Sequence, residues 1–132
     1  MLPLIELDLS KLGKDIPRIA CRDVKFNKET EAYKLTKSKV ADDLDEATTQ
    51  KLSETAVAAY RAVKLRDYGR IDMRLTPEGE VYVIEANPNP WLSSKHEFAM
   101  AAKKSGRSYT QLIETIVDSA IARTKRTNDG GG

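Results

Sequence analysis

Apolar and charged residues alternate along two short runs of this chain, which flank a turn containing Pro77 and Gly79. In residues 70–75 the odd positions are apolar and the even positions are charged. In residues 81–86 the even positions are apolar and the odd positions are mixed. Alternation with a period of two on both sides of such a turn predicts a β-hairpin with one buried face.

The register of this hairpin depends on the length of its loop. A loop of two residues (78–79) or four (77–80) pairs apolar residues along one face: Ile71 with Ala86, Met73 with Ile84, and Leu75 with Tyr82. A three-residue loop with a glycine bulge is also common in such turns, but it would set Asp72 opposite Ile84 and mix the faces. Because a one-residue slip moves every side chain to the other face, the apolar pattern favours the first register.

The favoured register places two carboxylates, Asp72 and Glu85, directly opposite each other. Opposed residues have Cβ atoms about 5 Å apart, and like charges there are destabilising. With the amide oxygen of Asn87 two residues further on, they form an all-oxygen cluster that would suit Mg²⁺. The alternative is that Arg70 and Arg74, on the same face, neutralise the acids in a surface ion network. The spacing leaves both interpretations open.

Helices are predicted on either side of the hairpin. Asp45 is the expected N-cap of a helix that runs to about residue 65, and its apolar stripe should cover the hairpin: Leu52, Ala56, Ala59, Tyr60 and Val63. A second helix spans 97–105 and ends at Gly106. The run from Ser108 to Gln111 is a capping box that opens a third helix.

The remaining segments are predicted as strands, a loop and a tail. Residues 1–9 and 17–24 are expected to be strands, and the polar residues 27–45 a loop. Residues 1–123 form one domain in this interpretation, and the basic, glycine-rich residues 124–132 are expected to be a flexible tail or linker. The predicted fold class is α+β, with a mainly antiparallel sheet covered by helices.

Composition narrows the class of protein. A length of 132 residues allows one small domain. The 22 Lys and Arg nearly balance the 20 Asp and Glu, and no basic run interleaved with aromatic residues predicts a nucleic-acid partner. The lone Cys21 excludes an internal disulfide and suits a reducing compartment. No signal peptide and no apolar run of about 18 residues are present, so we expect a cytoplasmic protein without a membrane span.

The motif around the hairpin resembles the C-terminal part of the ATP-grasp ligases, specifically the D-alanine–D-alanine ligase group. The residues that carry the resemblance, over roughly positions 2–123, are Asp67 to Asp72, Glu85 to Pro90, Glu97 to Gly106, Ser108-Tyr109 and, upstream, Val24-Lys25-Phe26. The thirteen-residue step from Asp72 to Glu85, followed by Glu-x-Asn, is the specific part of this match.

The resemblance implies an ATP- and Mg²⁺-dependent ligase that joins a carboxylate to an amine through an acyl phosphate. It implies that Asp72, Glu85 and Asn87 hold Mg²⁺, or Mn²⁺, between the β- and γ-phosphates. Arg70 would stabilise the transferring phosphoryl group and the oxyanion. Lys25 would sit on a loop that closes over the nucleotide and contact the γ-phosphate. Family precedent also sets the position of Ile84 against the adenine ring, but the favoured register points Ile84 away from Asp72 unless the strand bulges there.

The resemblance also implies that the chain is one part of a larger enzyme. The family has an N-terminal domain and a lysine-bearing central domain that hold ATP from the other side, so this piece alone is expected to be inactive. Expected partners are ATP, an amino acid or another carboxylate substrate, and those two domains; a homodimer is compatible with the family. A non-catalytic interaction or regulatory module, derived from the fold, is the alternative.

Two residues depart from the ligase pattern. Trp91 stands where the family usually has glycine, and His96 where the D-alanine ligases have serine. By resemblance these positions border the second amino-acid pocket. A tryptophan fills space and adopts a positive φ only at a cost, so the chain predicts an acceptor other than D-alanine, or an ATP-grasp enzyme with another substrate.

Overall fold

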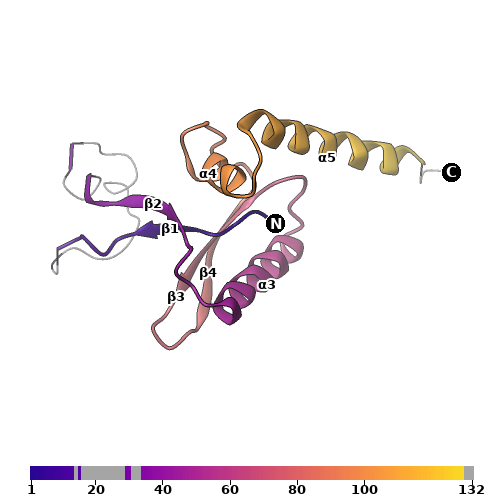
Figure 1. The fold of residues 1–132 in the computed structure, drawn as a ribbon. Helices are drawn as coiled ribbons and strands as arrows, with labels where there is room; N and C mark the ends of the chain where they lie inside the picture. Colours follow the sequence, from indigo (N-terminus) through magenta and orange to yellow (C-terminus); the bar gives the residue numbers. More distant parts are fainter. Residues whose placement is uncertain (14, 16–28, 31–33, 130–132) are drawn as a thin grey trace.

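The computed structural model describes residues 1–13, 15, 29–30 and 34–129. Its elements are, in chain order, β1 (Ile5–Asp8), β2 (Lys37–Val40), α3 (Glu46–Ala62), β3 (Arg70–Leu75), β4 (Val81–Asn87), α4 (Glu97–Lys104) and α5 (Tyr109–Asp129). Figure 1 shows α3 running beside the β3–β4 hairpin, while α5 extends away from both sheets toward the C-terminus. The predicted α+β class with antiparallel strands and covering helices is confirmed.

The strands within the described residues form two antiparallel pairs, β1 with β2 and β3 with β4. Residues 37–40 form a strand with Ile5 opposite Val40, so the prediction of a continuous loop over 27–45 is wrong there. The sequence signal was weak because Lys-Ser-Lys-Val has a single apolar residue, and its strand conformation depends on the partner that β1 supplies. The predicted strand over 17–24 lies outside the described residues.

Helix α3 begins and covers the hairpin as predicted. The Asp45 carboxylate accepts hydrogen bonds from the Thr48 backbone N–H (2.8 Å) and the Thr48 hydroxyl (2.7 Å), which satisfies a donor of the first turn. Leu52 is buried, and Lys51 reaches the hairpin turn through a 2.6 Å hydrogen bond to the Gly79 carbonyl. The helix ends at Ala62, and Val63 is 54% exposed. The prediction that Val63 belongs to the apolar stripe that covers the hairpin is therefore wrong.

The two C-terminal helices follow the predicted signals. Gly106 has a φ of +81°, the left-handed conformation expected after the end of α4. In the capping box before α5 the Gln111 side chain accepts from the Ser108 N–H (2.8 Å), and the Ser108 hydroxyl accepts from the Gln111 N–H (3.2 Å). Helix α5 continues to Asp129, so residues 124–129 are helical where a flexible tail was predicted.

The core of the described chain is small. Its buried apolar side chains are Leu12, Leu52, Ala101, Ala102 and Leu112. Ala101 and Ala102 lie on α4, which contacts β1, β2 and α5 and therefore joins the β1–β2 pair to the C-terminal helix. Within the described ranges no helix combines the length and the apolar character needed to cross a bilayer.

The β3–β4 hairpin combines two registers. Near the turn Met73 lies opposite Val83 and Leu75 opposite Val81, so the predicted pairing with Ile84 and Tyr82 is wrong. The loop is the three-residue form: the Gly79 N–H donates to the Thr76 carbonyl (3.0 Å), the Thr76 N–H donates to the Glu80 carbonyl (2.9 Å), and Gly79 has a φ of +82°.

A register shift between Asp72 and Met73 then restores the predicted pairing at the open end of the hairpin. There Ile71 lies opposite Ala86, and Arg70 opposite Asn87. Ile84 has no partner in the ladder and is the extra residue of a β-bulge. The bulge thus removes the mixing of faces that counted against the three-residue loop.

Candidate functional site

The carboxylates of Asp72 and Glu85 belong to directly opposed residues of β3 and β4, as predicted. Asn87 follows Glu85 by two positions and pairs with Arg70, so all four residues share one face of the hairpin. Asp72 is half-buried and Glu85 is exposed. The open end of the hairpin therefore gathers two carboxylates, one carboxamide and one guanidinium.

The bulge adds Ile84 to this same face. Near the turn, Ile84 shares a face of β4 with Tyr82, because the two are two residues apart, and Tyr82 pairs with Arg74. At the open end, Glu85 pairs with Asp72 and lies on the same face as it. Arg74 and Asp72 also share a face because they are two residues apart, so Ile84 and Glu85 both lie on the face of Asp72. The side chain of Ile84 is 68% exposed beside the acids. The conflict between the strand parity and the family position of Ile84 is thereby resolved.

Arg70 and Asp72 form a bidentate ion pair along β3. Arg70 Nε lies 2.6 Å from Asp72 Oδ1, and Nη2 lies 2.9 Å from Oδ2, with the side chains 32% and 30% exposed. This hydrogen bonding raises the pKa of the Arg70 guanidinium above its usual value against the effect of partial burial, and the negative charges of Asp72, Glu85 and Glu97 add to the rise. The predicted ion network is therefore present at Asp72.

The ion pair does not exhaust the donor set for a cation. A carboxylate has about four lone-pair sites, of which a bidentate arginine uses two. Among the described residues no group of three or more His, Cys, Asp or Glu is placed to hold a metal. A cation here would therefore take Asn87 as a further ligand and complete its coordination with water or with phosphate oxygens, since Mg²⁺ commonly combines one or two carboxylates with such ligands.

The Asn87 carboxamide is held by the backbone that follows it. Its Oδ1 accepts a hydrogen bond from the Asn89 N–H (2.9 Å), and the Tyr68 hydroxyl donates to Asn89 Oδ1 (2.7 Å). The Tyr68 ring meets Phe98 edge to face, with centroids 6.0 Å apart. Tyr68, Asn89 and Phe98 lie within the motif that carried the resemblance, but nothing in their spacing assigned them these contacts.

Another residue without a predicted role is Glu97 at the start of α4. Its Oε1 accepts a 2.7 Å hydrogen bond from the Ser38 hydroxyl of β2, and its charge acts on Arg70. This contact ties β2 to the start of α4, whose Glu97 charge acts on Arg70 of the β3–β4 hairpin. The sequence could not show it, because residues 38 and 97 are far apart in the chain.

The positions that depart from the ligase pattern lie together. The rings of Trp91 and His96 are stacked, with centroids 4.2 Å apart and planes at 20°. Trp91 is 64% exposed, and the His96 side chain makes no capping hydrogen bond to α4. The remaining predicted site residue, Lys25, lies outside the described residues.

Comparisons with known proteins point to one family. The model of the family described as D-ala D-ala ligase C-terminus matches residues 14–118. An uncharacterized protein of Sinorhizobium fredii, y4sG, is 33% identical over 123 residues, which cover 93% of this chain and 34% of that protein. A D-alanine–D-alanine ligase of Aquifex aeolicus is 30% identical over 118 residues, covering 88% and 35%.

A solved structure shows the same fold. The crystal structure of D-alanine–D-alanine ligase from Bacillus anthracis complexed with ATP has a TM-score of 0.64 at 24% identity, covering 68% of this chain and 31% of that one. The chain thus spans about a third of the length of the proteins that it matches.

Proposed function

The chain belongs to the family of D-alanine–D-alanine ligase C-terminal domains, and on that premise we propose that it is the metal- and phosphate-binding domain of an ATP- and Mg²⁺-dependent carboxylate–amine ligase. The family resemblance and the ATP-grasp fold class predicted from the motif are confirmed. Because the chain spans about a third of its relatives, the proposed active site is completed by N-terminal and central ATP-grasp domains.

The observation that carries this proposal is the opposition of Asp72 and Glu85. Like charges directly opposed on a hairpin destabilise it, and a bound cation would convert that cost into binding energy. Asp72, Glu85 and Asn87 would hold Mg²⁺, which Mn²⁺ could replace. The ion, when bound, would neutralise the charge that collects on the β- and γ-phosphates of ATP.

The proposed reaction has two steps. A substrate carboxylate oxygen attacks the γ-phosphorus of ATP, so that an O–P bond forms as the bond to ADP breaks, leaving an acyl phosphate. An amine then attacks the acyl carbon; a C–N bond forms, the C–O bond to phosphate breaks, and the nitrogen gives up one proton. Arg70 is proposed to stabilise the transferring phosphoryl group through Nη1, which the bond to Asp72 does not use.

Two further roles are proposed from the family. Lys25 would contact the γ-phosphate from a loop that closes over the nucleotide. The Trp91–His96 stack supports an acceptor other than D-alanine, because two rings in contact occupy the position where the family has a glycine and a serine. The amine acceptor would therefore differ in shape from the second D-alanine of the relatives.

The experiment is phosphate release from Mg²⁺-ATP by the enzyme that unites this domain with the rest of the ATP-grasp fold, screened over pairs of carboxylates and amines. Glu85→Gln should abolish the Mg²⁺-dependent release while the far-UV circular dichroism stays unchanged. The matched control is Glu78→Gln, the same change in the exposed turn of the hairpin. Normal turnover by Glu85→Gln would remove Glu85 from the mechanism.

A non-catalytic module is the second candidate, favoured by the bidentate ion pair of Arg70 with Asp72, which already neutralises one of the two proposed metal-binding carboxylates. Titration of the chain with Mn²⁺ and ATP separates the two. Saturable Mn²⁺ binding that Glu85→Gln removes supports the ligase domain. Equal, non-saturating responses of the two proteins would favour the module.

A further inference from the structure

The Asn87 carboxamide can serve a cation only if it presents its oxygen. The oxygen accepts, whereas the NH₂ group carries two donors that repel a cation. The Asn89 N–H donates to Asn87 Oδ1 at 2.9 Å. This bond selects the amide rotation in which the oxygen, and not the NH₂ group, meets the Asn89 N–H, and it leaves the second lone pair of the oxygen for a cation. The rotation of this amide is therefore decided by where the Asn89 N–H points.

The backbone around Asn89 is restricted by two prolines, and the Asn89 side chain is held by a residue from another segment. Pro88 and Pro90 fix their own φ and restrict the residues before them, and neither has an N–H. Asn89 is therefore the sole backbone donor within residues 88–90. Its side chain is held from outside, by the 2.7 Å hydrogen bond from the Tyr68 hydroxyl.

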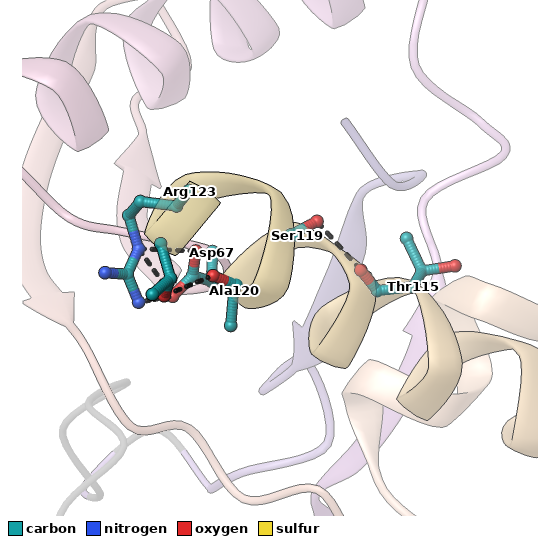
Figure 2. Close-up of polar contacts among 6 residues, drawn as sticks. Asp67, Thr115, Ser119, Ala120 and Arg123 are labelled. Atoms are coloured by element: carbon teal, nitrogen blue, oxygen red, sulfur yellow. Dashed lines mark hydrogen bonds and ion pairs between the residues drawn. The ribbon is translucent and has the colours of Figure 1, made fainter. Parts of the chain in front are cut away.

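Tyr68 is itself held on both sides. Its ring contacts Phe98 of α4 edge to face. Its backbone follows Asp67, which has a φ of +62° and a side chain only 15% exposed. Figure 2 shows Arg123 of α5 facing Asp67: Nη2 lies 2.8 Å from Oδ2, and Nε lies 3.0 Å from Oδ1. An ion pair between residues 56 positions apart thus fixes the segment from which Tyr68 projects.

We propose that Tyr68 is a positioning residue for Asn87: its hydroxyl holds Asn89, and the Asn89 N–H holds the carboxamide oxygen toward the acidic face. This inference rests on the proposed function of Asp72, Glu85 and Asn87 as a metal site. Outer groups that orient ligands commonly change metal affinity by about 10- to 100-fold. Because Tyr68 acts through one more residue, we expect an effect at the lower end, about tenfold.

The test is Mn²⁺ binding to the full 132-residue chain, followed by loss of the electron paramagnetic resonance signal of free Mn²⁺. Tyr68→Phe keeps the ring and its contact with Phe98, so the fold should persist. Its dissociation constant for Mn²⁺ should rise about tenfold. Asn89→Ala should behave alike, and the double variant should be no worse than either single one, because both changes break one chain of contacts.

The matched control is Tyr109→Phe, which removes a hydroxyl that donates to the Leu92 carbonyl at the same distance of 2.7 Å. Its Mn²⁺ affinity should equal that of the wild type. A second readout is independent of metal: in ¹H–¹⁵N spectra of the metal-free chain, the Asn87 carboxamide and the Asn89 backbone amide should shift in Tyr68→Phe and not in Tyr109→Phe.

Three results decide the matter. Loss of binding in Glu85→Gln with a tenfold weakening in Tyr68→Phe supports the inference. Loss in Glu85→Gln with unchanged Mn²⁺ affinity and unchanged Asn87 signals in Tyr68→Phe overturns the role of Tyr68 and leaves the proposed function standing. Equal Mn²⁺ binding by the wild type and Glu85→Gln overturns the metal site itself, and the inference with it.

Discussion

The two strand pairs of the described chain, β1–β2 and β3–β4, place opposite and like charges, respectively, across from each other. In β1–β2 the directly opposed residues are complementary: Glu6 lies opposite Lys39, and Asp8 opposite Lys37. Lys39 Nζ lies 3.2 Å from Glu6 Oε2, and the hydrogen bonds that Lys39 donates to Glu6 and Asp43 raise its pKa. In β3–β4 the opposed pair is Asp72 with Glu85, and the nearest compensating charge, Arg70, comes from the same strand.

The difference separates a pairing that stabilises its strands from one that destabilises them and that, in the proposed function, binds a metal ion. Opposite charges across a hairpin favour it, and like charges oppose it. The β1–β2 pair also has no register shift, whereas β3–β4 contains a bulge beside its acids, where such irregularities commonly re-aim side chains. Both features support the proposal that the open end of β3–β4 is the functional one.

The largest effect is expected from the helix that covers the second hairpin. Leu52→Ala should lower the free energy of unfolding by about 2–4 kcal/mol, because it opens a cavity at one of the few buried positions. Urea denaturation measures this loss. Leu52→Met, which conserves volume, is the control and should cost about 1 kcal/mol or less. Hydrogen exchange should accelerate more in β3–β4, which α3 contacts, than in β1–β2, which α4 contacts. A uniform acceleration would contradict this difference between the two strand pairs.

The ion pair of Asp67 with Arg123 should make the stability of the protein depend on pH in the acid range. The hydrogen bonds from Arg123 lower the pKa of Asp67 below the value of 3.8 typical of a free aspartate. Because the unfolded chain then binds more protons, this stabilisation is complete above the unfolded-state pKa and is lost as the pH falls through the lowered folded-state pKa. Urea denaturation midpoints should be measured from pH 6 down to pH 2. They should fall more steeply with decreasing pH in the wild type than in Asp67→Asn.

The control for this pH dependence is Arg123→Ala, in which Asp67 remains but lacks its partner. It should lose the same part of the slope as Asp67→Asn. A wild-type slope that survives both substitutions would assign the acid sensitivity to other carboxylates.

Exchanging like for opposite charges at the directly opposed positions of β3–β4 and β1–β2 should have a smaller effect on the free energy of unfolding. Glu85→Lys makes the pair opposite Asp72 complementary, so the free energy of unfolding should rise by about 0.2–1 kcal/mol while Mn²⁺ binding is lost. The reciprocal change, Lys39→Glu, sets two glutamates opposite each other in β1–β2 and should lower the urea midpoint. If Glu85→Lys instead lowers the free energy of unfolding, the opposition of Asp72 and Glu85 does not destabilise β3–β4. The difference between the two strand pairs would then not exist.

The smallest effect on stability concerns the bulge residue. Ile84→Ala removes a side chain that is 68% exposed, so the free energy of unfolding should change by no more than about 0.5 kcal/mol. If Ile84 contacts the nucleotide, as the family position predicts, ATP affinity should fall while stability does not. Val83→Ala, a neighbouring change on the other face, is the control for affinity and should leave ATP binding unaltered.

Local signals in the sequence predicted much of the fold. Asp45 begins α3, Gly106 follows the end of α4, and Ser108 with Gln111 opens α5, because each of these signals acts within one helical turn. The strand at 37–40 was missed because its few apolar residues depend on β1. The pairing of Asp72 with Glu85 was predicted correctly, although the loop length assumed for it was wrong, and the bulge at Ile84 absorbed the difference.

The sequence by itself determined the family, the oxygen-rich composition of the proposed site and the alternation along β3, since these follow from residue identity and spacing along one chain, whereas the parity of β4 was predicted correctly only at the open end of the hairpin. Only the tertiary structure decided what holds that site in place. The hydrogen bond from Tyr68 to Asn89, the ion pair of Asp67 with Arg123 and the contact of Ser38 with Glu97 join residues 21, 56 and 59 positions apart. Such contacts depend on how helices and hairpins pack in space, and no local pattern of residues encodes them.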